Sequence, residues 1–126
     1  RTKKALAQIS VNSVNYLRNN RLKVIKPVSY LDMLILESNA KLIITDSGGV
    51  QKEAYFFKVP CVTLRDETEW VETVESGWNA LVGADKKKIL NASRFTSHVL
   101  RSPSHVSQNI FGDGKTAEKI MQILSP

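Results

Sequence analysis

The chain has 126 residues, of which 42% are hydrophobic and 24% are charged, a composition typical of a soluble globular protein. Its length is enough for one domain and leaves no room for a second, and no apolar run approaches the ~18 residues that a membrane-spanning helix needs. The net charge is +6, but the basic residues gather in the first predicted helix and at residues 86–88, without interleaved aromatic side chains. We therefore expect a solvated basic face or a contact with an absent acidic domain, and neither a nucleic-acid nor a membrane partner.

Strand and helix patterns alternate along the chain. Short β-branched runs are followed by longer segments with apolar residues at helical spacing, which predicts an α/β fold: a Rossmann-like parallel sheet of about four strands with flanking helices. Ser29 is a natural N-cap for the second helix, and Asp85 opens the fifth. The last helix is expected to bury one face formed by Ala117, Ile120, Met121 and Leu124. The predicted helices cover residues 2–19, 30–39, 49–57, 68–75, 85–100 and 115–124, and the predicted strands cover 22–25, 41–45, 60–64 and 79–82.

The turn at residues 46–49 separates the second predicted strand, which should be buried, from the helix that follows it. Gly48 and Gly49 would let the backbone approach a ligand closely, and the free N–H groups at the helix start favour an anion. Ser47 would add a hydroxyl donor and could itself cap the helix. The motif is neither GxGxxG nor GxxxxGK[ST], so dinucleotide and P-loop chemistry have no support. From these residues alone, a phosphate cradle and a plain tight turn remain alternatives.

Other polar residues are predicted to lie at the same edge of the sheet. Ligands of open α/β sheets bind beyond the carboxyl ends of the strands, where Pro27 and residues 46–49 and 65–68 all fall. Arg65 could bind a phosphate oxygen through its forked guanidinium, or it could pair with a neighbouring acid. We interpret the acidic cluster here as a helix start that arranges Arg65, rather than as acid–base machinery; its members are Asp66, Glu67, Glu69 and Glu72.

The remaining candidate groups have simpler interpretations. Cys61 lies in a predicted buried strand and fits a core residue of a protein in a reducing cytoplasm. His98 and His105 have no partner at metal-ligand spacing, so we expect no metal. Trp70 and Trp78 are expected to be packing residues.

The run from Asp46 to Glu72, DSGGVQKEAYFFKVPCVTLRDETEWVE, resembles the non-hydrolysing UDP-N-acetylglucosamine 2-epimerases. The C-terminal domains of these GT-B type enzymes carry an Asp-Ser-Gly-Gly-x-Gln-x-Glu turn and, after the next strand, an Arg-Asp-x-Thr-Glu segment. The resemblance covers about the last third of such an enzyme. It extends over most of this chain, at Arg1-Thr2, Pro27, Tyr30-Leu31, Leu81-Val82-Gly83 and Phe111-Gly112-Asp113-Gly114.

The resemblance implies that residues 1–126 are part of a C-terminal nucleotide-binding domain whose N-terminal partner domain is absent. The full-length enzyme would be a cytoplasmic homodimer of cell-envelope polysaccharide biosynthesis that interconverts UDP-N-acetylglucosamine and UDP-N-acetylmannosamine without a cofactor. Open alternatives are an epimerase of a diacetamido uronic acid, a GT-B glycosyltransferase, and a non-catalytic binding module. A complete domain of this type has about six strands, so we expect the isolated chain to be marginally stable, rearranged, or paired with another copy.

The resemblance also assigns roles to particular residues. It implies that the UDP diphosphate binds to Ser47, Gly48, Gly49 and Arg65, and that Glu53 accepts hydrogen bonds from the ribose diol. It implies that the catalytic acids belong to the absent domain, so we expect no catalytic residue and no activity in this chain. A uracil pocket would be formed by Pro27, Tyr30 and Met33, the last of which is aromatic in many relatives.

Overall fold

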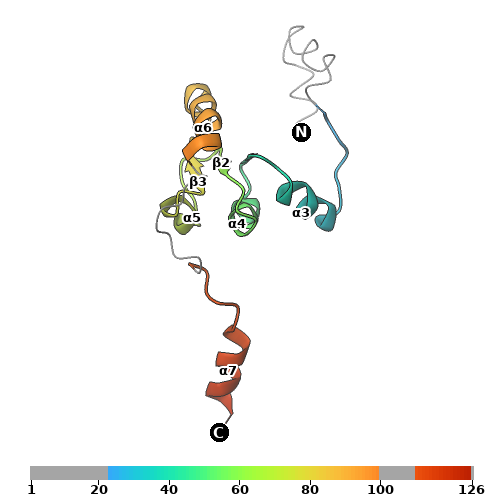
Figure 1. The fold of residues 1–126 in the computed structure, drawn as a ribbon, viewed down its shortest axis with the longest axis vertical. Helices are drawn as coiled ribbons and strands as arrows, with labels where there is room; N and C mark the ends of the chain where they lie inside the picture. Colours follow the sequence, from blue (N-terminus) through green and yellow to red (C-terminus); the bar gives the residue numbers. More distant parts are fainter. Residues whose placement is uncertain (1–22, 100–109, 126) are drawn as a thin grey trace. The chain divides into compact units, whose positions relative to one another are not determined.

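The computed structural model in Figure 1 describes residues 23–99 and 110–125, so the predicted helix at 2–19 lies outside the described residues. The chain divides into two units, Arg1–Asp32 and Met33–Pro126, and the second contains the sheet. The helices are α3 (Tyr30–Ser38), α4 (Gly48–Phe56), α5 (Val71–Glu75), α6 (Lys86–Val99) and α7 (Thr116–Leu124), and the strands are β1 (Ile43–Thr45), β2 (Cys61–Thr63) and β3 (Asn79–Leu81).

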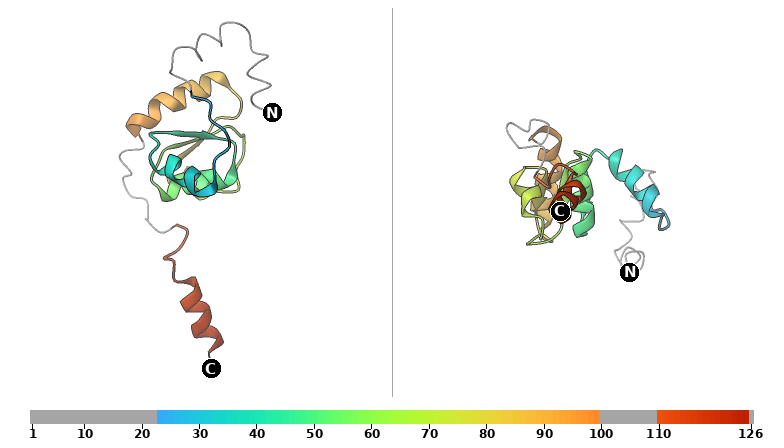
Figure 2. Two further views of the ribbon diagram at one scale, coloured as in Figure 1. Left: turned by 90° about the vertical axis from the view of Figure 1, so that its right-hand side faces the viewer. Right: turned by 90° about the horizontal axis from the view of Figure 1, so that it is seen from below.

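The sheet is parallel, with the strands in the order β1-β2-β3. Ile43 is level with Cys61, and Cys61 is level with Asn79, so the three strands end at a common edge. Helix α4 packs against β1 and β2, α5 packs against β3, and α6 packs against β2. Figure 1 shows α4 and α5 on one side of the sheet and α6 on the other, and Figure 2 shows α6 again on the side away from α4. The α/β class predicted from the sequence is confirmed.

The predicted strand at residues 22–25 is wrong over its described part. Lys23, Val24 and Ile25 form no strand and are exposed. Their β-branched side chains fit a strand, but a strand also needs a neighbour to satisfy its backbone hydrogen bonds. The described sheet therefore has three strands rather than four.

Strand β1 is an edge strand and is only half covered. Ile43 faces α4 within a small apolar core, whereas Ile44 is 48% exposed because its side chain points to the opposite face. The expectation of a buried strand is thus correct for one face. Cys61 is 1% exposed in the same core, which confirms its predicted place.

The helix starts were predicted with mixed success. The Ser29 hydroxyl accepts the Asp32 N–H at 3.2 Å before α3, and the Asp85 carboxylate accepts the Lys88 N–H at 2.8 Å in α6, so both caps are confirmed. Helix α5 begins later than predicted, because the Thr68 hydroxyl accepts the Trp70 N–H in a turn that precedes the helix.

The last helix differs from its prediction in burial. Helix α7 forms as expected, but its predicted apolar face is exposed to solvent within the described structure. An amphipathic pattern predicts a helix and its apolar side, but burial requires a surface for that side to pack against. Within the described part of the chain, no helix combines the length and hydrophobicity that spanning a membrane would require.

Candidate functional site

The turn between β1 and α4, in which a phosphate cradle was predicted, leads into the helix through an extended N-cap residue. Ser47 occupies the N-cap position with φ −84° and ψ 128°, and its N–H donates to the Thr45 hydroxyl at 3.0 Å. The Ser47 side chain makes no capping hydrogen bond, contrary to the suggestion that it caps the helix, and the residue is exposed. A Cβ built on Gly49 would meet only the Ser47 hydroxyl, at 4.0 Å. The turn is therefore open at Gly49, and the first N–H groups of α4 have no partner within the helix.

The protein's own Glu69 carboxyl group lies against Gly48, in the space that a Cβ would fill. The same carboxylate accepts a hydrogen bond from Arg65 Nη1 at 3.0 Å, in a pair whose side chains are 38% and 49% exposed. Of the two roles predicted for Arg65, the structure shows the pairing with a neighbouring acid. Exposed pairs of this kind contribute only about 0–1 kcal/mol, so another anion could displace Glu69 at little cost.

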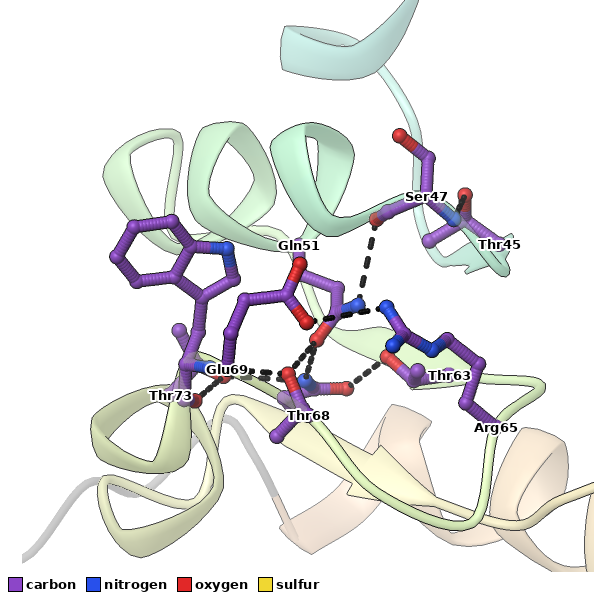
Figure 3. Close-up of polar contacts among 10 residues, drawn as sticks. Thr45, Ser47, Gln51, Thr63, Arg65, Thr68, Glu69 and Thr73 are labelled. Carbon is purple, nitrogen blue, oxygen red and sulfur yellow. Dashed lines mark hydrogen bonds and ion pairs between the residues drawn. The ribbon is translucent and has the colours of Figure 1, made fainter.

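A buried polar network joins the cradle to the loop that carries Arg65. Figure 3 shows its side chains gathered between the start of α4 and the loop after β2. Gln51 Oε1 accepts hydrogen bonds from the Thr68 hydroxyl at 2.6 Å and from Asn79 Nδ2 at 3.0 Å, while Gln51 Nε2 donates to the Ser47 carbonyl at 3.3 Å. Asn79 also donates to the Thr73 hydroxyl at 3.0 Å and accepts from the Thr63 hydroxyl at 2.7 Å.

This network sets the geometry of the site, because it ties four elements to one another. Gln51, Thr63 and Thr73 have no solvent exposure, and Asn79 is 4% exposed. Buried polar groups that are fully hydrogen-bonded hold their elements in one arrangement. No role was predicted for Gln51, although it is part of the Asp-Ser-Gly-Gly-x-Gln-x-Glu motif, or for Asn79, whose sequence signal was a polar residue at an inward-facing position of a strand.

Two carboxylates lie together at the other side of α4. Glu53 is half-buried on α4, and Glu37, in the last turn of α3, is only 3% exposed. Within the described part of the chain, no donor group makes a hydrogen bond to either oxygen of Glu37. Burial, followed by the negative charge of Glu53 and a hydrogen bond between the two carboxyl groups, raises the pKa of Glu37 to about 7. The sequence signal for Glu37 was an acid within an apolar segment, and it was missed.

The residues assigned to a uracil pocket are divided between the two units. Pro27 and Tyr30 belong to the first unit and are exposed, and Met33 belongs to the second. The pocket therefore stays a prediction.

An aromatic cluster lies at the far end of α4. The ring of Phe111 packs edge to face with the rings of Tyr55 and Trp70. The distances between ring centroids are 5.2 Å and 6.1 Å. The Lys52 ammonium lies 4.1 Å from the centroid of the Trp70 ring. Trp70 is a packing residue, as predicted, and the cluster brings Phe111 next to α4.

The remaining candidates offer no reactive group. Burial raises the pKa of the Cys61 thiol to about 11, so the thiol is protonated near neutral pH and is unsuited to act as a nucleophile. His105 lies outside the described residues. Across residues 23–99 and 110–125, no three histidine, cysteine or acidic side chains gather as a metal site would require.

Comparison with known proteins gives consistent matches. A family described as UDP-N-acetylglucosamine 2-epimerase matches residues 1–125. The chain is 49% identical over 126 residues to the UDP-N-acetylglucosamine 2-epimerase of Methanocaldococcus jannaschii, covering 99% of the chain and 33% of that protein. It is 44% identical over 104 residues to the UDP-2,3-diacetamido-2,3-dideoxy-D-glucuronate 2-epimerase of Pseudomonas aeruginosa, covering 82% of the chain and 28% of that protein.

A solved structure is similar over the same region. The crystal structure of the Methanocaldococcus jannaschii enzyme in complex with UDP-GlcNAc and UDP matches 99% of the chain and 33% of its own, with a TM-score of 0.71 and 47% identity. The chain thus spans about a third of the length of the proteins that it matches.

Proposed function

The chain belongs to the UDP-N-acetylglucosamine 2-epimerase family, and from this premise we propose that it is the UDP-binding part of an enzyme that interconverts UDP-N-acetylglucosamine and UDP-N-acetylmannosamine. The observation that supports this most directly is the turn at residues 47–49, which is open at Gly49 and holds the exposed Glu69 carboxylate against Gly48, at the start of α4 and beside Arg65. The solved relative bound to UDP-GlcNAc and UDP supports the same class of ligand. Residues 1–126 would be part of a C-terminal nucleotide-binding domain that acts with an N-terminal domain.

Each proposed contact follows from the chemistry of its residue. The first N–H groups of α4 and the Ser47 hydroxyl would donate to the diphosphate oxygens, which Gly48 and Gly49 allow to come close. Arg65 would leave Glu69 and bind a phosphate oxygen. Glu53 lies one helical turn beyond Gly49 and would accept hydrogen bonds from the two ribose hydroxyls. Pro27, Tyr30 and Met33 would form the uracil pocket.

The proposed reaction is an elimination followed by a re-addition. A base removes the proton at C2 of the sugar while the bond from C1 to the diphosphate breaks, which gives a glycal and free UDP. Protonation of C2 on the other face and attack by the diphosphate at C1 then give the epimer. The cradle would stabilise the departing diphosphate and retain it, while the acids and bases that move protons would belong to the N-terminal domain. This chain would contain no catalytic residue and would be inactive alone.

A second candidate substrate is a UDP-linked diacetamido uronic acid. The 44% identity to the Pseudomonas aeruginosa enzyme favours it, since the residues proposed here contact only the nucleotide. Incubating the intact protein with each UDP-sugar, and separating the epimers chromatographically, decides between the two substrates. We propose in addition that the intact enzyme is a cytoplasmic homodimer.

The nucleotide site is tested by calorimetric titration of UDP into the intact protein. Ser47→Ala and Glu53→Ala should each weaken binding roughly tenfold or more, because each removes hydrogen bonds to a polar ligand. Glu75→Ala, an exposed acid at the end of α5, is the charge-matched control for Glu53→Ala and should bind as the wild type does. Absence of UDP binding by the folded wild-type protein would refute the proposal.

A further inference from the structure

Glu37 is a buried acid to which no described donor group makes a hydrogen bond. Only 3% of the residue is exposed, and the side chain within hydrogen-bonding reach of it is another carboxyl group, that of Glu53. An ionised carboxylate in this position would lose its hydration and gain nothing in return, at a cost of several kcal/mol. A protein relieves such a cost by leaving the group protonated.

The surroundings of Glu37 also oppose a negative charge. Glu37 lies in the last turn of α3, where the helix dipole is negative, and no basic residue lies in that turn. Among the described residues, Glu53 on α4 raises the pKa of Glu37, and Glu37 in turn raises the pKa of Cys61 on β2. The Cys61 thiol is neutral, because its pKa is raised, so Glu53 is the charged group that faces Glu37.

We propose that Glu37 is a positioning residue: held as a neutral carboxylic acid, it donates a hydrogen bond to Glu53 and fixes that carboxylate to receive the ribose hydroxyls of the nucleotide. This inference rests on the proposed UDP site. The shared proton occupies one oxygen of Glu53 and leaves the other lone pairs for the ligand. The pair then carries a single negative charge.

We expect the preference for ribose over 2′-deoxyribose to depend on pH. Below about pH 7, Glu37 holds its proton and Glu53 stays in place. Above that pH, Glu37 ionises, and the two carboxylates repel each other. Because Glu37 is buried, the half-buried Glu53 is the side chain that would turn away. The contact with ribose would weaken as a result.

The experiment compares UDP with 2′-deoxy-UDP by calorimetric titration of the intact protein from pH 6 to pH 8.5. Both ligands carry the same titrating diphosphate, so the ratio of their dissociation constants isolates the contact with the 2′-hydroxyl. In the wild type we expect UDP to bind about tenfold more tightly at pH 6, as a hydrogen bond to a charged group implies, and this preference to fall to about twofold at pH 8.5.

Two variants separate positioning from a structural role. Glu37→Gln has nearly the same shape and donates through its amide at every pH, so the preference for UDP should stay high across the range. Leucine cannot donate a hydrogen bond, so the Glu37→Leu variant should show a small preference for UDP over 2′-deoxy-UDP that does not change with pH. If both variants keep the pH profile of the wild type, the inference is wrong while the UDP site stands. If UDP does not bind the folded wild type, the proposed function fails and the inference fails with it.

Discussion

Replacing Asn79 by alanine should destabilise the fold strongly, because the Asn79 side chain makes three of the hydrogen bonds in the buried network. Its side chain donates to Gln51 and Thr73 at 3.0 Å each and accepts from Thr63 at 2.7 Å. A buried hydrogen bond contributes about 1 kcal/mol, and leaving the Thr63 hydroxyl without its acceptor adds a desolvation cost. We therefore expect Asn79→Ala to lower the free energy of unfolding by about 3 kcal/mol.

A double-mutant cycle tests the physical reason for this loss. Thr63→Val removes one of the three hydrogen bonds and should cost about 1 kcal/mol by itself. Because both substitutions remove the same bond, the double variant should cost about 1 kcal/mol less than the sum of the single variants. Urea unfolding of the intact protein, followed by tryptophan fluorescence, measures all three values. Asn91→Ala, at an exposed position of α6, is the control and should change stability by no more than about 0.5 kcal/mol. A loss below about 1 kcal/mol for Asn79→Ala, or strict additivity in the cycle, would refute the reasoning.

Three further predictions concern single positions. Gly83 has φ 59° and its missing Cβ faces the Asp66 carboxylate, so Gly83→Ala should cost about 1–2 kcal/mol in urea unfolding, whereas Gly49→Ala should be nearly neutral. Glu69→Gln should raise the affinity for UDP roughly threefold in calorimetry, because it removes the anion that competes for the cradle; unchanged or weaker binding would contradict this. The raised pKa of Glu37 favours folding below about pH 4.5, and this contribution is lost as the pH rises through about 7. Glu37→Gln should therefore be more stable than the wild type at pH 8, by up to about 3 kcal/mol, and thermal unfolding that shows no such gain would argue against it.

The parts of the site that follow one another in the chain could be predicted from the sequence. The run from Asp46 to Glu53 determines its own local structure, because two glycines after an apolar strand and before a helical pattern leave few conformations. The alternation of strands and helices then places Arg65 at the same edge of the sheet.

The parts that depend on distant residues could not be predicted in this way. Gln51 and Thr68 are 17 positions apart and meet only once α4 and the loop after β2 have packed. Glu37 resembles any acid near a helix end until the burial of its side chain is known. The prediction of a strand at 22–25 is wrong over its described part for a related reason. These residues fit a strand, but in the described structure no neighbouring strand pairs with them.

Three acidic residues near the proposed cradle would repel a diphosphate if all of them were charged and unpaired. In the proposed site, a diphosphate would bind where Glu37, Glu53 and Glu69 all lie on bordering elements. Burial keeps Glu37 neutral, and Arg65 compensates Glu69 until a ligand arrives. In the proposed site, a diphosphate that displaced Glu69 from Arg65 would replace one anion by another, so the guanidinium would keep a partner during the exchange. Because the Arg65–Glu69 pair is exposed, the exchange would cost about 1 kcal/mol or less, since the released Glu69 carboxylate can turn towards water. Glu53 would face the uncharged hydroxyls of the ribose rather than the diphosphate.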